Sequence, residues 1–394
     1  MKNCAIVCEY NPFHTGHLYQ LSRVGEYAPN NIFCIMSGAF VQSAMPAFCD
    51  KALRAECALL GGADAVIELP TVYSTASAQI FAEGALKIIS GIKDITHIAM
   101  GAAADPSDVL NIADVKISHA DEFSAELKKQ LNNGKSYNSA SAAALSRLCD
   151  RFYSKDCNVE QTLSDPNSIL CLEYICAVNK FAANIEPLII PRLGAQYNSS
   201  ETRGDYISAT AIRQAESDGK LDSVARYIPF KYKEIADWRK RHSPDVDCYK
   251  RMAVYALKCA HSNEIKDLRN CSEGMEYLLK ELSYLHDFDD YIDKAVGRRY
   301  GKKRLYRLFM DILLNVDKSA VDKDFCTRLL ACKKDLDFTL LPACVKTNNA
   351  DIKVAAAESA DVKDILEIDL RATALYNTIC RIDGDYFNYS LVKV

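Results

Sequence analysis

The chain has 394 residues, which is long enough for two or three domains with buried cores. Its 48 lysines and arginines against 52 aspartates and glutamates give a net charge of −4, which excludes a protein coated in positive charge but allows a local basic patch. The N-terminal apolar run stops before Glu9, too short for a signal peptide, and no stretch approaches the ~18 continuous apolar residues of a membrane helix. We expect a soluble, cytoplasmic protein without a membrane or DNA partner.

The sixteen cysteines are scattered along the chain. No C-x-x-C pair occurs, and no group of Cys and His has the spacing of a zinc finger. Cys4 and Cys8 fall in an apolar run, where Cys behaves as a small apolar residue. We therefore expect reduced, mostly buried thiols and no metal site made by the protein.

Residues 4–8 (C-A-I-V-C) form a short apolar run bounded by polar residues, which is typical of a buried strand in a parallel sheet. Asn11 and Pro12 favour a turn after this strand, and from Leu18 to Val24 apolar residues recur at helical spacing. The chain therefore begins with a strand, a turn and a helix.

The tetrapeptide His14-Thr15-Gly16-His17 falls at this strand-to-helix junction. Unpaired N–H groups and the positive end of the helix dipole make such a junction an anion site, at the edge where open α/β sheets bind nucleotides. Two histidines three residues apart share one helix face, and Gly16 removes a side chain that would block a phosphate. The pattern favours a phosphate clamp; the alternative is that one histidine caps the helix and the other packs.

Strand and helix patterns alternate through the first hundred residues. Asn31–Ser37, residues 65–69 and residues 96–100 predict further buried strands, and residues 50–61, with Asp50 as N-cap, and 75–89 predict helices. This alternation is typical of a doubly wound α/β domain with a parallel, Rossmann-like sheet.

A second motif occupies residues 207–213 (I-S-A-T-A-I-R). At a helix start, Ser208 and Thr210 would donate hydroxyl groups, and Arg213 a bidentate fork, to the β- and γ-phosphates of a leaving pyrophosphate. The alternative for Arg213 is an ordinary surface arginine. The two motifs, in this order, resemble the signatures of the HIGH-motif nucleotidyltransferase superfamily, whose members bind ATP and attack its α-phosphate.

Longer strings narrow the resemblance. Residues 36–42 (M-S-G-A-F-V-Q), 46–55 (P-A-F-C-D-K-A-L-R-A) and 62–70 (G-A-D-A-V-I-E-L-P) are similar to the tRNA(Met) cytidine acetate ligases, and the similarity continues in family order along almost the whole chain. The resemblance implies that acetate and ATP are condensed to acetyl-adenylate. It also implies that the acetyl group passes to the wobble cytidine of elongator tRNA(Met), giving N(4)-acetylcytidine.

The same resemblance implies the site residues. ATP would be bound by Gly101, Asn167, Arg192 and the stretch around the first motif, although Asn167 read alone is only a turn residue. Mg²⁺ is expected as the counter-ion of the ATP phosphates.

Lys51 is a candidate contact to phosphate or carboxylate, with a solvated helix lysine as the equal alternative. The catalytic candidates are His14, His17, Lys51, Ser208, Thr210 and Arg213. The ATP-binding stretch comprises Val7, Cys8, Glu9, Tyr10, Asn11, Pro12, Phe13, His14, Thr15, Gly16, His17, Leu18, Tyr19 and Gln20.

The chain departs from the family pattern at three places, each of which loses polar groups near the expected site. The family's Arg-Gly-Glu is replaced by Ser43, Ala44 and Met45; its F-G-S-E reads M-G-A-A, with Ala102 and Ala103; and its Y-H-D reads Y-N-S, with Asn198. The ATP motifs are intact, so these changes bear on acetate recognition and on transfer to tRNA.

From about residue 226 the alternation stops. Helical patterns occupy residues 231–242, 249–261, 274–286, 305–314 and 362–379, with short strands predicted at 338–341 and 352–354. We expect a nucleotidyltransferase domain over residues 1–225 and a mainly helical domain over residues 226–394.

Residues 297–307 of the helical domain carry six positive charges with two interleaved tyrosines. Such a segment can neutralise phosphates while a ring stacks on a splayed base of a single-stranded RNA loop. Read alone, the pattern favours a solvated helix start; the family resemblance favours tRNA binding. The RNA-binding candidates are Arg298, Arg299, Lys302, Lys303, Arg304 and Arg307.

Three function classes stay open at this point. An acetate ligase acting on tRNA needs both the ATP site and the basic segment. A small-molecule adenylyltransferase shares the ATP motifs but has no need of that segment. A non-catalytic, ATP-responsive RNA-binding protein is suggested by the lost polar groups, and acetate-dependent exchange of pyrophosphate with ATP separates it from the ligase.

Overall fold

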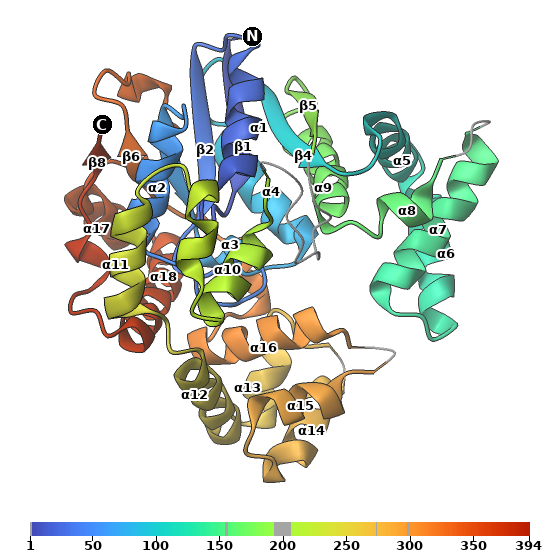
Figure 1. Ribbon diagram of the computed structural model, residues 1–394. Coiled ribbons are helices and arrows are strands. Elements are labelled where there is room, and N and C mark those ends of the chain that lie inside the picture. The colour runs from blue at the N-terminus through green and yellow to red at the C-terminus, as the bar shows by residue number, and fades with distance from the viewer. Residues whose placement is uncertain (1, 154–156, 193–205, 273, 298–299) are drawn as a thin grey trace.

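The computed structural model describes residues 2–153, 157–192, 206–272, 274–297 and 300–394. Within these residues, eight strands form one sheet in the order β5-β4-β1-β2-β3-β6-β7, with β8 beside β6 (Figure 1). Helices cover the sheet, and two helical lobes extend from it, one carrying α5 to α8 and one carrying α12 to α16. The bounds of the strands are β1 Asn3–Cys8, β2 Asn31–Ser37, β3 Ala65–Leu69, β4 Ile95–Ala102, β5 Glu186–Pro191, β6 Thr327–Cys332, β7 Val345–Lys346 and β8 Val392–Lys393.

The part of the sheet built from the first half of the chain is parallel, as the sequence predicts. The pairs β1/β2, β1/β4, β2/β3 and β4/β5 are all parallel, and the register places Cys8 opposite Met36. The carboxyl ends of these strands therefore meet at one edge of the sheet. In an open α/β fold this is the edge at which ligands bind.

The helices of the first half alternate with these strands. Asp50 is the N-cap of α2, as expected, and its side chain accepts a hydrogen bond from Ala52 N at 2.6 Å. The bounds are α1 Thr15–Gly25, α2 Lys51–Leu60, α3 Thr71–Ser74, α4 Ala78–Ile89, α5 Pro106–Ser118, α6 Ala120–Asn132, α7 Tyr137–Phe152, α8 Val159–Thr162, α9 Pro166–Phe181 and α10 Ala209–Ser217.

The second half is mainly helical but is not a separate unit. Strand β6 pairs antiparallel with β3, with Ala65 opposite Cys332, so the chain returns to the sheet after the α12–α16 lobe. A division at residue 225 therefore cuts across the sheet. The remaining helices are α11 Tyr232–His242, α12 Val246–Cys259, α13 Ser262–Asp267, α14 Met275–Glu281, α15 Phe288–Ala295, α16 Lys302–Leu314, α17 Asn349–Glu358 and α18 Ala360–Cys380.

Two strands predicted in the second half are wrong. Residues 338–341 contain a 3-10 turn over Phe338–Leu340, with the Asp337 side chain accepting from Thr339 N, and residues 352–354 lie inside α17. Short apolar runs of this kind do not distinguish a strand from a buried helix turn. All sixteen cysteines are free and most are buried, as expected.

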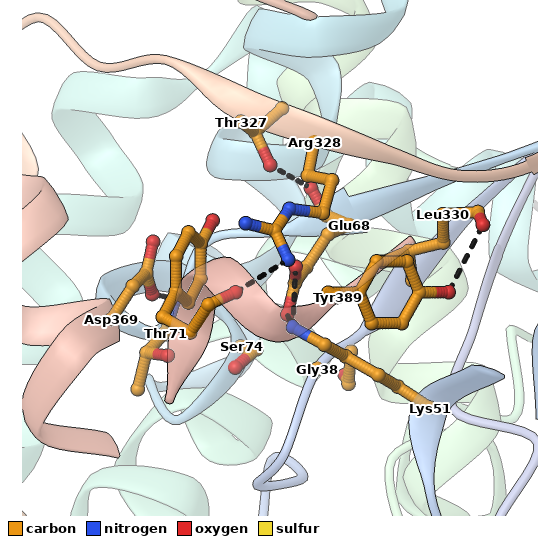
Figure 2. A network of polar contacts seen from close by, with 12 residues as sticks. Gly38, Lys51, Glu68, Thr71, Ser74, Thr327, Arg328, Leu330, Asp369 and Tyr389 are labelled. Atoms are coloured by element: carbon orange, nitrogen blue, oxygen red, sulfur yellow. Dashed lines mark hydrogen bonds and ion pairs between the residues drawn. The ribbon is translucent and has the colours of Figure 1, made fainter. Parts of the chain in front are cut away.

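A buried ion pair joins α2 to β3. Lys51 Nζ lies 2.6 and 2.8 Å from the two carboxylate oxygens of Glu68, and about 10% of each side chain is exposed. The ammonium also lies 5.0 and 5.2 Å from the ring centroids of Tyr386 and Tyr389. The Arg328 guanidinium of β6 lies 4.0 Å from the Tyr386 centroid. Figure 2 shows how these side chains from distant parts of the chain converge.

Further contacts extend this network. The Thr327 hydroxyl donates to the backbone oxygen of Glu68 at 2.6 Å, and Thr71 N donates to Asp369 of α18 at 2.8 Å (Figure 2). Burial, and then the charge of Glu68, raises the pKa of Asp369 to about 6. Through these contacts, β6, α18 and the C-terminal residues Tyr386 and Tyr389 are held against β3 and the helices before and after it in the chain, α2 and α3.

This placement corrects one expectation for Lys51. Its side chain is buried rather than solvated, and it contacts the Glu68 carboxylate. The ammonium is satisfied within the fold, which favours a structural role.

We expect Lys51→Met to lower the free energy of unfolding by about 3–5 kcal/mol, because it leaves the Glu68 carboxylate buried without its cation. The double variant Lys51→Met/Glu68→Gln removes that unpaired charge and should recover part of the loss. Urea denaturation of the two single variants, the double variant and the wild type measures the coupling. A Lys51→Met protein as stable as the wild type would contradict the assignment.

Candidate functional site

A cavity of about 800 Å³ lies at the carboxyl edge of the sheet. Its wall includes residues that end β1, β4 and β5, the starts of α1, α9 and α10, and part of α16. Most of the stretch predicted to bind ATP reaches it; Pro12, Phe13, Thr15 and Leu18 are not among the lining residues. The lining members of that stretch are Val7, Cys8, Glu9, Tyr10, Asn11, His14, Gly16, His17, Tyr19 and Gln20.

The two histidines of the first motif form a capping box at the start of α1. His14 is the N-cap, and its Nδ1 accepts from Gly16 N at 3.0 Å. His17 Nδ1 accepts from His14 N at 3.3 Å. A neutral imidazole that accepts at Nδ1 carries its proton at Nε2. Because both rings line the cavity, each has an Nε2–H as the donor left for a ligand.

Both rings are neutral at physiological pH. Burial, then the charges of Arg192 and Arg213, lowers the pKa of His14 to about 3. Burial, then His14 and Arg192, holds the pKa of His17 well below its usual 6.5. The rings are stacked with their centroids 3.8 Å apart. Capping and ligand binding are thus not alternatives, because the cap fixes the tautomer that leaves a donor for an anion.

Gly16 is required by this cap. A Cβ at this position would lie 2.9 Å from Cε1 and 3.1 Å from Nδ1 of His14. Contacts this short would displace the ring that caps the helix. The absence of a side chain at Gly16 therefore keeps the His14 ring in its capping position.

The second motif meets the first. Ser208 is the N-cap of α10, and its Oγ accepts from Ala211 N at 3.0 Å. Arg213 Nη1 donates to the backbone oxygen of Asn11 at 2.7 Å, across 202 residues of sequence, and Nη2 donates to the Thr210 hydroxyl at 3.0 Å. Ser208, Thr210 and Arg213 all line the cavity. Arg213 is therefore a positioned cation and not an ordinary surface arginine.

Three further predicted ATP-binding residues also line the cavity. Gly101 lies in β4, where a Cβ would stand 3.4 Å from Arg192 Cγ, and Arg192 N donates to the Ala102 oxygen at 3.0 Å. Asn167 lies in the first turn of α9, which Asp165 caps, rather than in an isolated turn. The structure thus brings together every predicted ATP-binding segment that it describes.

The basic residues of segment 297–307 that belong to α16 have two different environments. Lys303 and Arg307 line the cavity, whereas Lys302 lies over the Tyr306 ring at 5.8 Å and Arg304 donates to the Asn270 oxygen at 3.0 Å. Burial, and then the charge of Arg269, lowers the pKa of Arg307 to about 10, so it stays cationic at neutral pH. Arg298 and Arg299 lie outside the described residues.

Sequence reasoning missed the residue that holds the strand ends. Arg54 is 1% exposed, and its guanidinium donates to the backbone oxygens of Glu9 at 2.7 Å, Ser37 at 2.9 Å and Cys49 at 3.1 Å, and also to that of Gly38. The available signal was its place in the string D-K-x-x-R-A, which gives no indication of its partners.

Two of the six residues that depart from the family pattern lie on this wall. Ser43 and Met45 line the cavity, and Ala44 between them is buried with a φ of 59°. Ala102 is buried and Ala103 is exposed. Asn198 lies outside the described residues.

Among the described residues, no group of three or more His, Cys, Asp or Glu side chains is arranged to hold a metal ion. A search of the same residues finds no helix long and apolar enough to cross a membrane.

Comparisons with known proteins identify the family of this chain. The family described as HIGH Nucleotidyl Transferase matches residues 1–386. A tRNA(Met) cytidine acetate ligase of Caldanaerobacter subterraneus subsp. tengcongensis is 31% identical over 406 residues, covering 100% of this chain and 98% of the relative. One from Clostridium perfringens strain SM101 is 30% identical over 400 residues, covering 98% of both chains.

Solved structures agree as well. The crystal structure of apo Thermotoga maritima TmcAL matches with a TM-score of 0.91, and the structure of TmcAL bound with alpha-thio ATP matches with 0.89. Both are 25% identical to this chain and cover 100% of each chain. The chain belongs to the tRNA(Met) cytidine acetate ligase family of HIGH nucleotidyl transferases.

Proposed function

We propose that this protein condenses acetate with ATP to acetyl-adenylate and transfers the acetyl group to the wobble cytidine of elongator tRNA(Met), giving N(4)-acetylcytidine. The observation that supports this most strongly is that both nucleotidyltransferase motifs and two cations of α16 line one cavity. A small-molecule adenylyltransferase would have no need of those two cations, and family membership together with intact ATP motifs favours an enzyme over a binding protein.

Activation is an in-line displacement at phosphorus, so it needs positioning and charge stabilisation rather than a protein nucleophile. An acetate oxygen attacks the α-phosphate, and pyrophosphate leaves. The Nε2–H groups of His14 and His17 would donate to the α-phosphate. Arg213, held by the Asn11 carbonyl, would bind the β- and γ-phosphates.

Mg²⁺ would enter with ATP. With no acidic cluster among the described residues, the wall fits an ion held by phosphate oxygens and water rather than by a protein cage. The ion would neutralise phosphate charge, and the arginines of the wall would supply the rest.

The transfer step requires an RNA at the same cavity. Lys303 and Arg307 lie where they can bind phosphates flanking the target nucleotide. A target base in the cavity would meet acetyl-adenylate where it is formed, so the intermediate would not have to leave the protein.

The proposed reaction predicts that elongator tRNA(Met), incubated with the protein, ATP, Mg²⁺ and acetate, gains the mass of one acetyl group on the anticodon cytidine. His17→Ala removes one donor to the α-phosphate and should give little product. Nucleoside mass spectrometry measures the modification, and omission of acetate is the control. Binding of ATP without acetyl transfer by the wild type would favour the non-catalytic alternative.

The histidine geometry predicts that His14 stays a neutral Nε2–H tautomer from about pH 8 to about pH 5, because its pKa is about 3. NMR of ¹⁵N-histidine-labelled protein, assigned with His14→Gln, tests this. Since the unfolded chain binds protons below about pH 6.5 and the native ring does not, stability should fall as the pH drops from about 6.5 toward 3. A His14 titration near pH 6.5 would contradict the buried, capped arrangement.

The cavity position of Lys303 predicts that Lys303→Gln weakens tRNA binding and reduces its salt dependence by about one phosphate contact. Lys302→Gln, the neighbouring change in the same helix turn, is the matched control and should have a smaller effect. Fluorescence titration with labelled tRNA at several salt concentrations measures both. Equal effects of the two changes would show that the wall position of Lys303 is irrelevant to RNA binding.

A further inference from the structure

The cavity contains a carboxylate among its cations. Glu9 lines the wall directly after β1, and Arg213 and Lys303 act on its charge from α10 and α16. A carboxylate repels the phosphates that the rest of this wall suits, so the triphosphate of ATP does not account for its side chain. Glu9 is suited to a ligand group that donates N–H.

The Glu9 carboxylate is held on one side only. Gln42 N donates to its Oε1 at 2.7 Å, and Arg54 fixes the Glu9 backbone oxygen. Among the residues that the structure describes, Oε2 has no hydrogen-bond partner. The side chain is partly accessible from the cavity, so this oxygen is available to a ligand.

An unused donor lies on the same wall. The Gln42 side-chain nitrogen is buried and has no hydrogen-bond partner among the described residues, and Gln42 lines the cavity. Its backbone is bonded to Glu9, so an acceptor and a donor come from two linked residues. Cytosine presents the complement on its Watson–Crick edge, an exocyclic amine beside ring acceptors, and enzymes that act on an unstacked base commonly read that edge.

We propose that Glu9 is the general base of the acetyl-transfer step, accepting a hydrogen bond from the exocyclic amine of the target cytosine and taking its proton, while Gln42 binds the adjacent ring acceptor. This inference rests on the proposed function, which it deepens. The amine nitrogen forms a bond to the acetyl carbon of acetyl-adenylate, the bond from that carbon to the phosphate oxygen breaks, and AMP leaves. The proton lost from nitrogen goes to Glu9 and then to water.

The surroundings of Glu9 suit this role. Burial raises the pKa of its carboxyl above 4.5, and the Gln42 N–H and then Arg213, Arg54 and Lys303 oppose that rise. The other titratable groups beside it, Cys8 and Tyr174, have their own pKa values raised and stay neutral. A carboxylate with a raised pKa is a stronger base than an ordinary carboxylate, which suits it to accept a proton.

The test separates the two half-reactions in Glu9→Gln. Because Glu9 also belongs to the predicted ATP-binding stretch, acetate-dependent exchange of pyrophosphate with ATP is measured in parallel, and we expect transfer to fall by a much larger factor than exchange. Single-turnover transfer to tRNA should fall about 100-fold or more, the range for loss of a general base. Glu9→Asp, which keeps the carboxylate, should restore part of the transfer rate. The transfer rate should rise with pH in the wild type and lose that dependence in Glu9→Gln.

Three outcomes would overturn the proposal. Transfer by Glu9→Gln at the wild-type rate would show that no proton passes to this residue. Loss of pyrophosphate exchange in Glu9→Gln, with an active wild type, would assign Glu9 to activation instead. A wild-type protein that neither exchanges pyrophosphate nor acetylates tRNA would overturn the proposed function and the role of Glu9 with it.

Discussion

The site depends on one buried guanidinium. Arg54 donates to backbone oxygens at the ends of β1 and β2, at Glu9, Ser37 and Gly38, and to Cys49 ahead of its own helix. A buried cation is unfavourable unless its donors are satisfied, and here carbonyl groups satisfy them without a carboxylate. The consequence is that the chain leaves both strands in fixed directions. The histidine motif, which begins five residues after Glu9, starts from one of these fixed points.

The electrostatics of the cavity follow from that arrangement. Because the histidine rings are buried and close together, they are neutral donors, and the positive charge available to phosphates comes from arginines and Lys303. The Asn11 carbonyl orients Arg213, so the second motif is held in position next to the first although 202 residues separate these two partners. Preorganised donors of this kind need little rearrangement during reaction. The cavity is therefore set up for charge that develops on phosphate oxygens.

Local patterns predicted the local structure well, and long-range contacts were beyond them. Asp50 capping α2 and the parallel strands follow from spacing and residue type. The roles of Lys51 and Arg54, three residues apart in one helix, do not, because their partners lie in other strands and at the C-terminus. Strand β6 was missed for the same reason: only its pairing with β3, over 260 residues away along the chain, distinguishes it from other short apolar runs. Motifs predicted many of the residues that line the cavity, whereas the cavity position of Lys303 required the fold.

Ser43, Ala44 and Met45, which stand where the family pattern has Arg-Gly-Glu, alter the cavity wall but leave its hydrogen-bond donors in place. Ala44 N donates to the Val41 oxygen at 2.8 Å, Val41 N donates to Met45 O at 3.1 Å, and Tyr249 of α12 donates to the Ala44 oxygen at 2.7 Å. The turn that carries Gln42 is thus held by backbone bonds and by the α12–α16 lobe, neither of which depends on the side chains that differ. Gln42 N keeps its bond to Glu9, and the cations of α10 and α16 keep their places. Ser43 and Met45 in place of charged groups therefore lower the polarity of one part of the cavity, while the groups proposed to contact phosphate and base are retained.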